Sequence, residues 1–183
     1  MTNDSSVAAP QAMRSKAVKL GLVLSILTIL LGQFLGIVFG LNEDAVKSRL
    51  HASATEVRDT VYQGDDEAMN KVESKAWTYM KRAHLHAGGM GTTALALVLL
   101  VGLLGVSPKP ATAISAGLGA GGFGYSVFWM WAGFRAPGLG GTGAAKESLR
   151  WLAMPSSGAF VIATLWVLLL VLMSLTKADP VET

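Results

Sequence analysis

Four long stretches without a charged residue limit what this chain can fold into. They cover residues 20–42, 83–108, 110–134 and 151–176. A helix needs roughly 20 apolar residues to cross the ~30 Å hydrocarbon core of a bilayer, and each stretch is longer than that. The sequence therefore predicts an all-α integral membrane four-helix bundle with four transmembrane helices.

The composition supports a membrane protein. Hydrophobic residues make up 51% of the chain and charged residues only 15%, whereas soluble domains carry about a quarter charged residues. The first apolar stretch is longer than the 7–15 apolar residues typical of a signal peptide, and no A-x-A-like cleavage site follows it. We therefore expect this stretch to be a retained transmembrane anchor.

The sequence divides into two tails and one membrane domain. Residues 1–16 are small and polar without periodicity, which predicts a disordered N-terminal tail. The membrane domain then covers residues 17–176, and residues 177–183 form a C-terminal tail.

The distribution of Lys and Arg gives a prediction of orientation. Arg14, Lys16 and Lys19 flank the first span, which by the positive-inside rule predicts a cytoplasmic N-terminus and, after four spans, a cytoplasmic C-terminus. Ten Lys and Arg lie on the opposite side against five on this one. Most of them belong to residues 42–82, where seven bases balance eight acids, and longer translocated segments follow the rule less strictly. We predict a bacterial inner (plasma) membrane protein.

Residues 43–83 carry the pattern of an extramembrane helical hairpin between the first and second spans. Apolar residues recur at helical spacing in two runs, at positions 46, 50, 54, 57 and 61 and at positions 69, 72, 76, 80 and 83. The turn signal Gln63–Asp66 separates the two runs. In the alternative, both arms lie flat on the membrane as amphipathic helices, which would favour bulkier residues than this Val, Ala and Met stripe.

Rows of small residues mark two of the spans. Such rows let helix backbones approach closely in a membrane. They either form a docking face for a partner or second copy, or pack the four helices internally, and the sequence leaves both open. Gln33 beside the first row is expected to form an interhelical hydrogen bond. The helix-packing residues are Gly32, Gly36, Gly40, Gly117, Gly121 and Gly124.

The stretch KRAHLHAGGMG, residues 81–91, contains the candidate cofactor-binding residues His84 and His86. Histidine can ligate haem iron, copper or other metals. At i and i+2 on a helix, however, the two rings project about 200° apart. One of them could bind haem or copper with help from Met80, Met90 or another chain. The alternative is a polar rim at the lipid headgroups, where Lys81 and Arg82 reach phosphate.

The R-x-H-x-H arrangement that begins at Arg82 resembles the start of haem-ligating helices in the haem-copper oxidase superfamily, over residues 82 to about 100. The resemblance implies a haem ligand among these histidines. The chain departs from that superfamily because no other span contains a histidine and four spans are too few for the oxidase core.

Other function classes lack the residues that they need. The chain has no cysteine, and its net charge of +3 comes from bases that flank spans or alternate with acids, so we expect no nucleic acid partner. Gly138, Gly140 and Gly143 match G-x-G-x-x-G without a preceding strand, so we expect no nucleotide. Apart from His84 and His86 near one end of the second span, no acidic or basic residue lies inside a span, which argues against ion transport.

The sequence thus favours an accessory subunit or scaffold of a membrane complex that contacts lipid, other membrane subunits or a second copy of itself. We expect no catalytic residues and no cofactor. The alternative is a redox subunit that binds haem, metal or quinone through His84 and His86.

Overall fold

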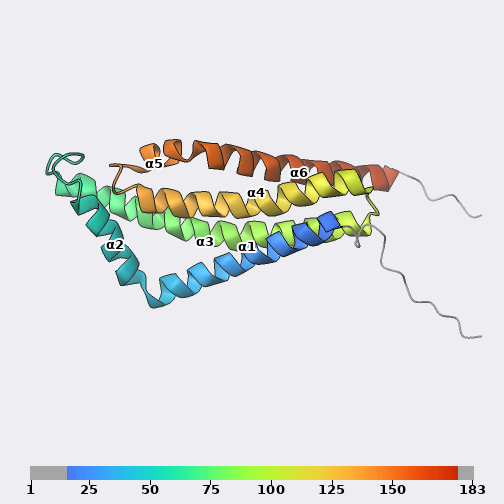
Figure 1. The fold of residues 1–183 in the computed structure, drawn as a ribbon, viewed down its shortest axis with the longest axis horizontal. Coiled ribbons are helices and arrows are strands. Elements are labelled where there is room, and N and C mark those ends of the chain that lie inside the picture. The colour runs from blue at the N-terminus through green and yellow to red at the C-terminus, as the bar shows by residue number, and fades with distance from the viewer. Residues whose placement is uncertain (1–15, 177–183) are drawn as a thin grey trace, which may run out of the picture.

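The computed structural model describes residues 16–176, and these residues form six helices and no strand (Figure 1). The all-α class is therefore confirmed for this part of the chain. The two predicted tails lie outside it, apart from Lys16. The helices are α1 (Lys16–Leu41), α2 (Glu43–Thr55), α3 (Asp66–Leu103), α4 (Pro108–Arg135), α5 (Thr142–Ser148) and α6 (Arg150–Thr176).

Within the described residues, three helices are long and apolar enough to cross a membrane. They are α1 over Val18–Leu41, α3 over Asp66–Leu103 and α6 over Arg150–Thr176. This finding fits an integral membrane protein. The remaining predicted span, over residues 110–134, corresponds to α4. This helix has 28 residues and is therefore about 42 Å long. Its most apolar stretch is less hydropathic than those of the other three because glycine and alanine take the place of large aliphatic residues along it.

The four long helices lie lengthwise along one another (Figure 1). Helices α3 and α4 pack together at the centre, α1 packs against both of them, and α6 packs against α4. The start of α1 and the end of α6 lie at the same end of the bundle, and the α2–α3 connection lies at the opposite end.

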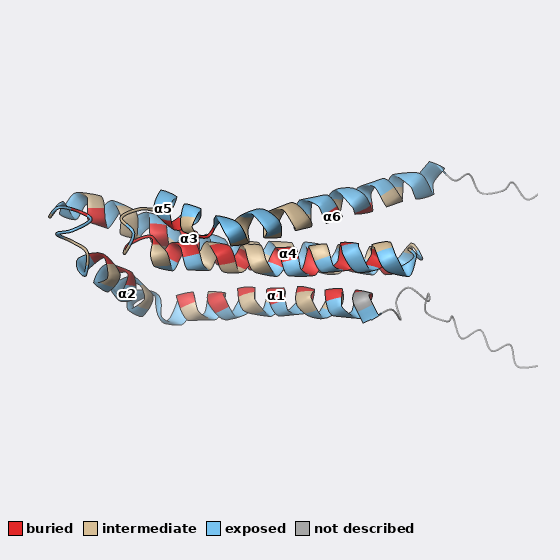
Figure 2. Cartoon of the chain, turned by 45° about the horizontal axis from the view of Figure 1, so that its top comes forward, coloured by how far each residue is buried: buried red, intermediate tan, exposed pale blue. Residues whose placement is uncertain are grey.

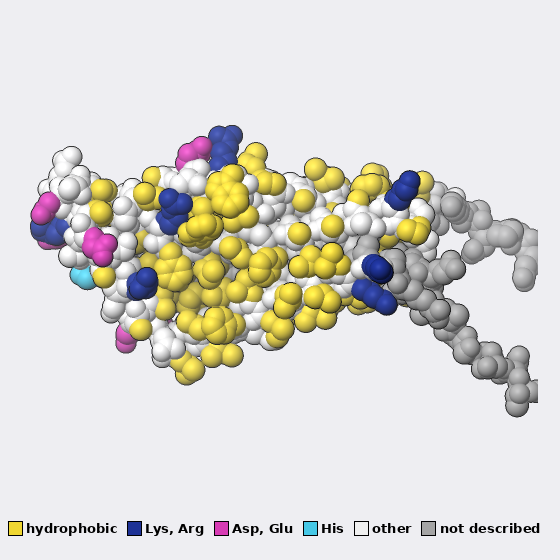
Figure 3. All heavy atoms as spheres, viewed as in Figure 1, with side chains coloured by type: hydrophobic (Ala, Val, Ile, Leu, Met, Phe, Trp, Pro, Cys, Tyr) yellow, Lys and Arg dark blue, Asp and Glu magenta, His cyan; other side chains and the backbone are white. Residues whose placement is uncertain are grey.

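Burial follows this arrangement. Figure 2 shows buried residues along α4 and along one side of α1, whereas α6 is mostly exposed. The exposed residues of α1 and α6 are mainly Leu, Ile, Val, Phe and Met. In Figure 3 charged side chains gather toward the two ends of the visible face, with hydrophobic and uncharged surface between them. An apolar band flanked by charged ends is what a bilayer requires.

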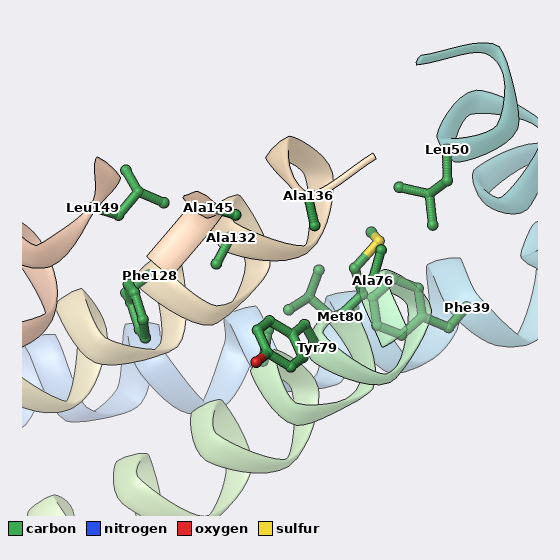
Figure 4. Packing of buried hydrophobic residues seen from close by; sticks show 12 residues of the cluster. Phe39, Leu50, Ala76, Tyr79, Met80, Phe128, Ala132, Ala136, Ala145 and Leu149 are labelled. Atoms are coloured by element: carbon green, nitrogen blue, oxygen red, sulfur yellow. The ribbon is translucent and has the colours of Figure 1, made fainter. Parts of the chain in front are cut away.

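Two buried clusters fill the bundle. The cluster near the α2–α3 connection contains Leu50, Tyr79, Met80, Phe128 and Leu149 together with several alanines. Figure 4 shows side chains from α1, α2, α3, α4 and α5 meeting there, with Leu149 just before the start of α6. The second cluster lies toward the opposite end. Its larger members are Val98, Val101, Ile114, Leu118 and Val167.

Two glycines of α1, Gly32 and Gly36, face α3 where the helices touch. A Cβ added at Gly32 would lie 2.8 Å from the backbone nitrogen of Gly88, and one at Gly36 would lie 2.9 Å from Cε1 of His84. Side-chain carbons almost never come that close. Gly40, by contrast, has nothing within 4 Å of its position.

Three glycines of α4, Gly117, Gly121 and Gly124, face α6 in the same way. A Cβ at Gly121 would lie 2.7 Å from the carbonyl oxygen of Ser156, and one at Gly117 would lie 3.1 Å from that of Ala159. Gly124 lies against the hydroxyl of Ser156. These glycines therefore occupy contacts between helices of the same chain.

The extramembrane segment differs from the predicted hairpin in its first arm. Helix α2 ends at Thr55, and residues 56–65 form turns, so a helical first arm reaching Val61 is wrong. The reason is a distant contact. Tyr62 is buried, and its hydroxyl donates a 2.6 Å hydrogen bond to the carbonyl oxygen of Pro137, beyond the end of α4. Gln63 and Gly64 then reverse the chain with φ of 54° and 79°.

The second arm begins at an N-cap and continues into the apolar part of α3 without interruption. The carboxylate of Asp65 accepts a 2.9 Å hydrogen bond from the backbone nitrogen of Ala68, which satisfies one free donor of the first turn. Met69 is buried with Ala54 and Tyr62, and this small cluster joins α3 to the turn segment.

Candidate functional site

The histidine segment lies on an unbroken helix. Residues 81–91 are all part of α3, and Gly88, Gly89 and Gly91 do not interrupt it. His84 and His86 therefore project from a regular helix in different directions.

His84 points toward α1. Its ring is half-buried, and Nδ1 donates a 2.8 Å hydrogen bond to the carbonyl oxygen of Gly32. A carbonyl can only accept, so Nδ1 carries the proton and the lone pair of the neutral ring is on Nε2. The ring also fills the space beside Gly36. His84 thus joins α3 to α1.

His86 points toward α4 instead. Its Nδ1 donates a 2.8 Å hydrogen bond to the carbonyl oxygen of Arg82, one turn earlier on the same helix. Its ring centroid lies 5.3 Å from that of Tyr125 and 5.6 Å from that of Trp129. The two histidines therefore face different neighbouring helices and do not converge on one point.

The other candidate ligands lie apart from these two histidines. His51 is on α2, where its Nδ1 lies 3.0 Å from a carboxylate oxygen of Glu73. Met80 is buried in the core against Gly133, and Met90 lies beside Gly122. Among the residues described, no group of three or more His, Asp or Glu side chains could hold a metal ion. A cofactor would therefore meet one histidine at a time.

A cluster of aromatic and basic side chains surrounds His86, and we call it the interfacial cluster: Tyr79, Arg82, His86, Tyr125, Trp129 and Lys146. The guanidinium carbon of Arg82 lies 5.3 Å from the Tyr79 ring centroid and 5.2 Å from that of Trp129. The ammonium of Lys146, on α5, lies 6.0 Å from the Tyr79 ring. Cations over aromatic faces gain about 0.5–2 kcal/mol each.

The cluster also contains an unused donor. Nε1 of Trp129 is buried and has no hydrogen-bond partner in the described part of the chain. The Tyr79 and Trp129 rings pack edge to face at 4.8 Å. Trp131 and Trp151 pair at 6.3 Å on neighbouring helices. Together these rings place an aromatic belt at the end of the bundle where the charge-free part of α3 begins.

The turn segment carries the shifted pKa values. Nε and Nη2 of Arg58 donate hydrogen bonds of 2.7 Å and 3.0 Å to the two carboxylate oxygens of Asp66. These hydrogen bonds lower the pKa of Asp66 and raise that of Arg58. Burial raises the pKa of Tyr62, and the nearby charge of Glu73 raises it further. These groups hold the turn in place.

Sequence reasoning did not predict that Arg82 and His86 would pack on Tyr79 and Trp129. A signal for it exists. Tyr79, Arg82 and His86 recur at three- and four-residue steps on α3, as Tyr125 and Trp129 do on α4, so each set lies on one helix face. Lys146 gives no such signal because it enters from α5. Comparisons with protein-family models, curated proteins and solved structures found no match for this chain.

Proposed function

We propose that this chain is a four-span integral membrane protein that acts as a scaffold or accessory subunit of a membrane complex. It associates with other membrane helices, first of all those of a second copy, through the outer face of α1. The proposal includes the bacterial inner membrane and cytoplasmic termini, which the bases flanking α1 favour.

The packing of α4 supports the fourth span. This helix lies lengthwise between α3 and α6 and also contacts α1. If those three helices cross the bilayer, α4 must lie at the same depth. Its lower hydropathy is no obstacle, because many of its residues are covered by neighbouring helices and do not face lipid.

The observation that carries the association is the position of Gln33. This amide is exposed on the side of α1 that faces away from the bundle. It lies about 12 Å along the helix from Leu41 and about 22 Å from Val18, within the apolar span. An amide facing hydrocarbon lacks the hydrogen bonds that water or protein would give it, and association with another helix restores them.

The surroundings of Gln33 have the spacing of a helix-pairing seam. Exposed residues recur along this side at alternating steps of three and four, which is the period of a left-handed helix pair. A single polar residue in such a seam sets the register of the pair. The seam consists of Val23, Ile26, Leu30, Gln33, Ile37 and Gly40.

A second copy of this chain suits the seam. A glutamine amide has both a donor and an acceptor, so it can pair with its own counterpart across a two-fold axis. Gly40 has open space beside it, which allows close approach of a partner helix. Of the six helix-packing glycines it alone is not taken up by a contact within the described bundle.

The test replaces the amide and keeps the shape of the side chain. Donor- and acceptor-labelled protein in lipid vesicles should give energy transfer that falls as the vesicles are diluted with lipid. Gln33→Leu should weaken the association roughly 3- to 30-fold, because an interhelical hydrogen bond in a membrane contributes about 0.6–2 kcal/mol. Leu169→Ala on α6, another exposed lipid-facing position, is the control and should associate as the wild type does. Equal association of Gln33→Leu and wild type would refute the seam.

One observation favours the redox alternative. Both histidines donate Nδ1–H to a backbone carbonyl, which is how metal-ligating histidines are commonly oriented, with Nε2 left to bind. Because the two rings face different helices, a haem or copper ion would take one ligand from this chain and the other from a partner.

A further inference from the structure

We propose that the pocket between α3 and α5 binds the phosphate of an anionic lipid headgroup. The inference rests on the proposed membrane location of the chain but not on its self-association. The pocket has a volume of about 270 Å³. It is lined by Lys75, Thr78, Tyr79, Arg82 and Thr142.

The pocket is rich in positive charge without a matching acid. Lys75 and Arg82 line it. The ammonium of Lys146 lies over the ring of Tyr79, which also lines the pocket. None of these three cations forms an ion pair within the described residues. Other bases of the extramembrane segment, such as Lys47 and Arg58, do have acidic partners. An anionic ligand bound in the pocket would therefore give these three cations the partner that the described residues do not supply.

The aromatic rings fix one of these cations in place. Arg82 lies over both Tyr79 and Trp129, so its guanidinium loses little further freedom when it binds a ligand. Its N–H groups donate no hydrogen bond to another described residue. A planar guanidinium with free donors matches two oxygens of a phosphate.

The position of the pocket along α3, at the expected level of the lipid headgroups, indicates a lipid as the source of that phosphate. Arg82 immediately precedes the charge-free part of α3, where lipid headgroups lie if α3 spans the bilayer. Leu85 follows one turn further into the membrane and is 66% exposed. A phosphate bound at Arg82 would thus have apolar surface beside it for an acyl chain, which a free phosphate ion cannot use.

The experiment titrates the full chain in mild-detergent micelles with phosphatidylglycerol or with phosphatidylcholine of the same acyl chains, and counts bound lipids by native mass spectrometry. Phosphatidylglycerol should bind more tightly. Each cation near an anionic headgroup contributes about fivefold, so Arg82→Gln with Lys146→Gln should weaken phosphatidylglycerol binding about 30-fold. Arg82→Gln alone should weaken binding about fivefold. Lys81→Gln, which also removes one charge from the same turn but outside the pocket, should keep binding within about twofold.

Three results would overturn the inference. Equal losses in Lys81→Gln and Arg82→Gln would indicate general charge attraction and no defined site. Displacement of phosphatidylglycerol by millimolar inorganic phosphate would indicate a site for a soluble anion. Equal binding of the two lipids would exclude headgroup recognition.

Two further variants keep the test decisive. Arg82→Lys preserves the charge and should keep most of the preference for phosphatidylglycerol. This result would show that a loss of binding does not require a folding defect at position 82. Gln33→Leu should bind lipid as the wild type does, so failure of the lipid site and failure of the α1 seam are separate results.

Discussion

Alanine substitutions at two glycines of α3, Gly89 and Gly91, measure how much the close packing of α1 against α3 contributes to the stability of the bundle. A Cβ at Gly91 would lie 2.8 Å from Cγ1 of Ile29, 2.9 Å from the backbone nitrogen of Ile29 and 3.2 Å from the carbonyl oxygen of Ser25. Gly89 is exposed and has nothing within 4 Å of the same position. The substitution to alanine is chemically identical at both sites.

The expected difference follows from those contacts. The side chain of Ile29 can rotate, but its backbone nitrogen cannot, so α1 must move away by about 0.5 Å to reach ordinary contact. Overpacking of this kind costs about 1–3 kcal/mol. Both variants share the helix-propensity gain of alanine over glycine, about 1 kcal/mol, which cancels in the comparison. Gly91→Ala should therefore be less stable than Gly89→Ala by about 1–3 kcal/mol.

The assay is reversible unfolding in mixed micelles as the fraction of denaturing detergent rises, followed by the fluorescence of the five tryptophans. Helix content by circular dichroism checks that both variants fold. Stabilities of Gly91→Ala and Gly89→Ala within about 0.5 kcal/mol of each other, the range of ordinary surface substitutions, would refute the close contact of α1 and α3.

Three further predictions concern the turn segment and the histidines. Tyr62→Phe removes the hydrogen bond to the Pro137 carbonyl and, among the described residues, leaves that oxygen with only the 3.3 Å hydrogen bond from the backbone nitrogen of Gly140. It should therefore ease local opening of residues 56–65 by about 0.5–1.5 kcal/mol, which hydrogen–deuterium exchange measures; unchanged exchange would contradict the contact. Arg58 lowers the pKa of Asp66 below its ordinary value of 3.8, so the ion pair should stabilise the turn above that pH and be lost as the pH falls through the lowered pKa. Protease resistance of the turn should show this transition, and Asp66→Asn should lack it. Replacing His84 and His86 together by Gln should leave folding intact, and isolated wild-type protein should show no stoichiometric haem or metal; a Soret band lost on His84→Gln would favour the redox function.

The positions of the long helices were predictable because their signals are local. The charge-free stretches correspond closely to α1, the second half of α3, α4 and α6. Most of these boundaries lie where Lys, Arg, Asp and Glu interrupt an apolar run, whereas α3 ends at Leu103, before Gly105 and the proline that begins α4. Span length and charge are properties of the segment itself, so no knowledge of neighbours is needed.

The end of α2 was not predictable because it depends on a contact across the chain. Val57 and Val61 continue the helical spacing of the first arm, yet the helix stops at Thr55. The hydroxyl of Tyr62 reaches Pro137, 75 residues away. Periodicity carries no information about such a partner.

The histidine site was predictable in part. Helical geometry alone indicates that side chains two residues apart diverge, and the structure places His84 toward α1 and His86 toward α4. Which helix each ring would meet depends on the rotation of α3 within the bundle. The packing of Arg82 on Trp129 depends on that same rotation.

The crossing of the bilayer by α4 tests the four-span bundle most directly. The chain has no cysteine, so Lys109→Cys and Gly141→Cys place single thiols in the first turn of α4 and after its end. Both are to be labelled in intact cells and in inverted vesicles with a membrane-impermeant maleimide. We predict that the thiols at positions 109 and 141 react from opposite sides of the membrane. Gly64→Cys should react from the side of position 141, and thiols at positions 5 and 182 should react from the side of position 109. Labelling of positions 109 and 141 from the same side would contradict the four-span bundle.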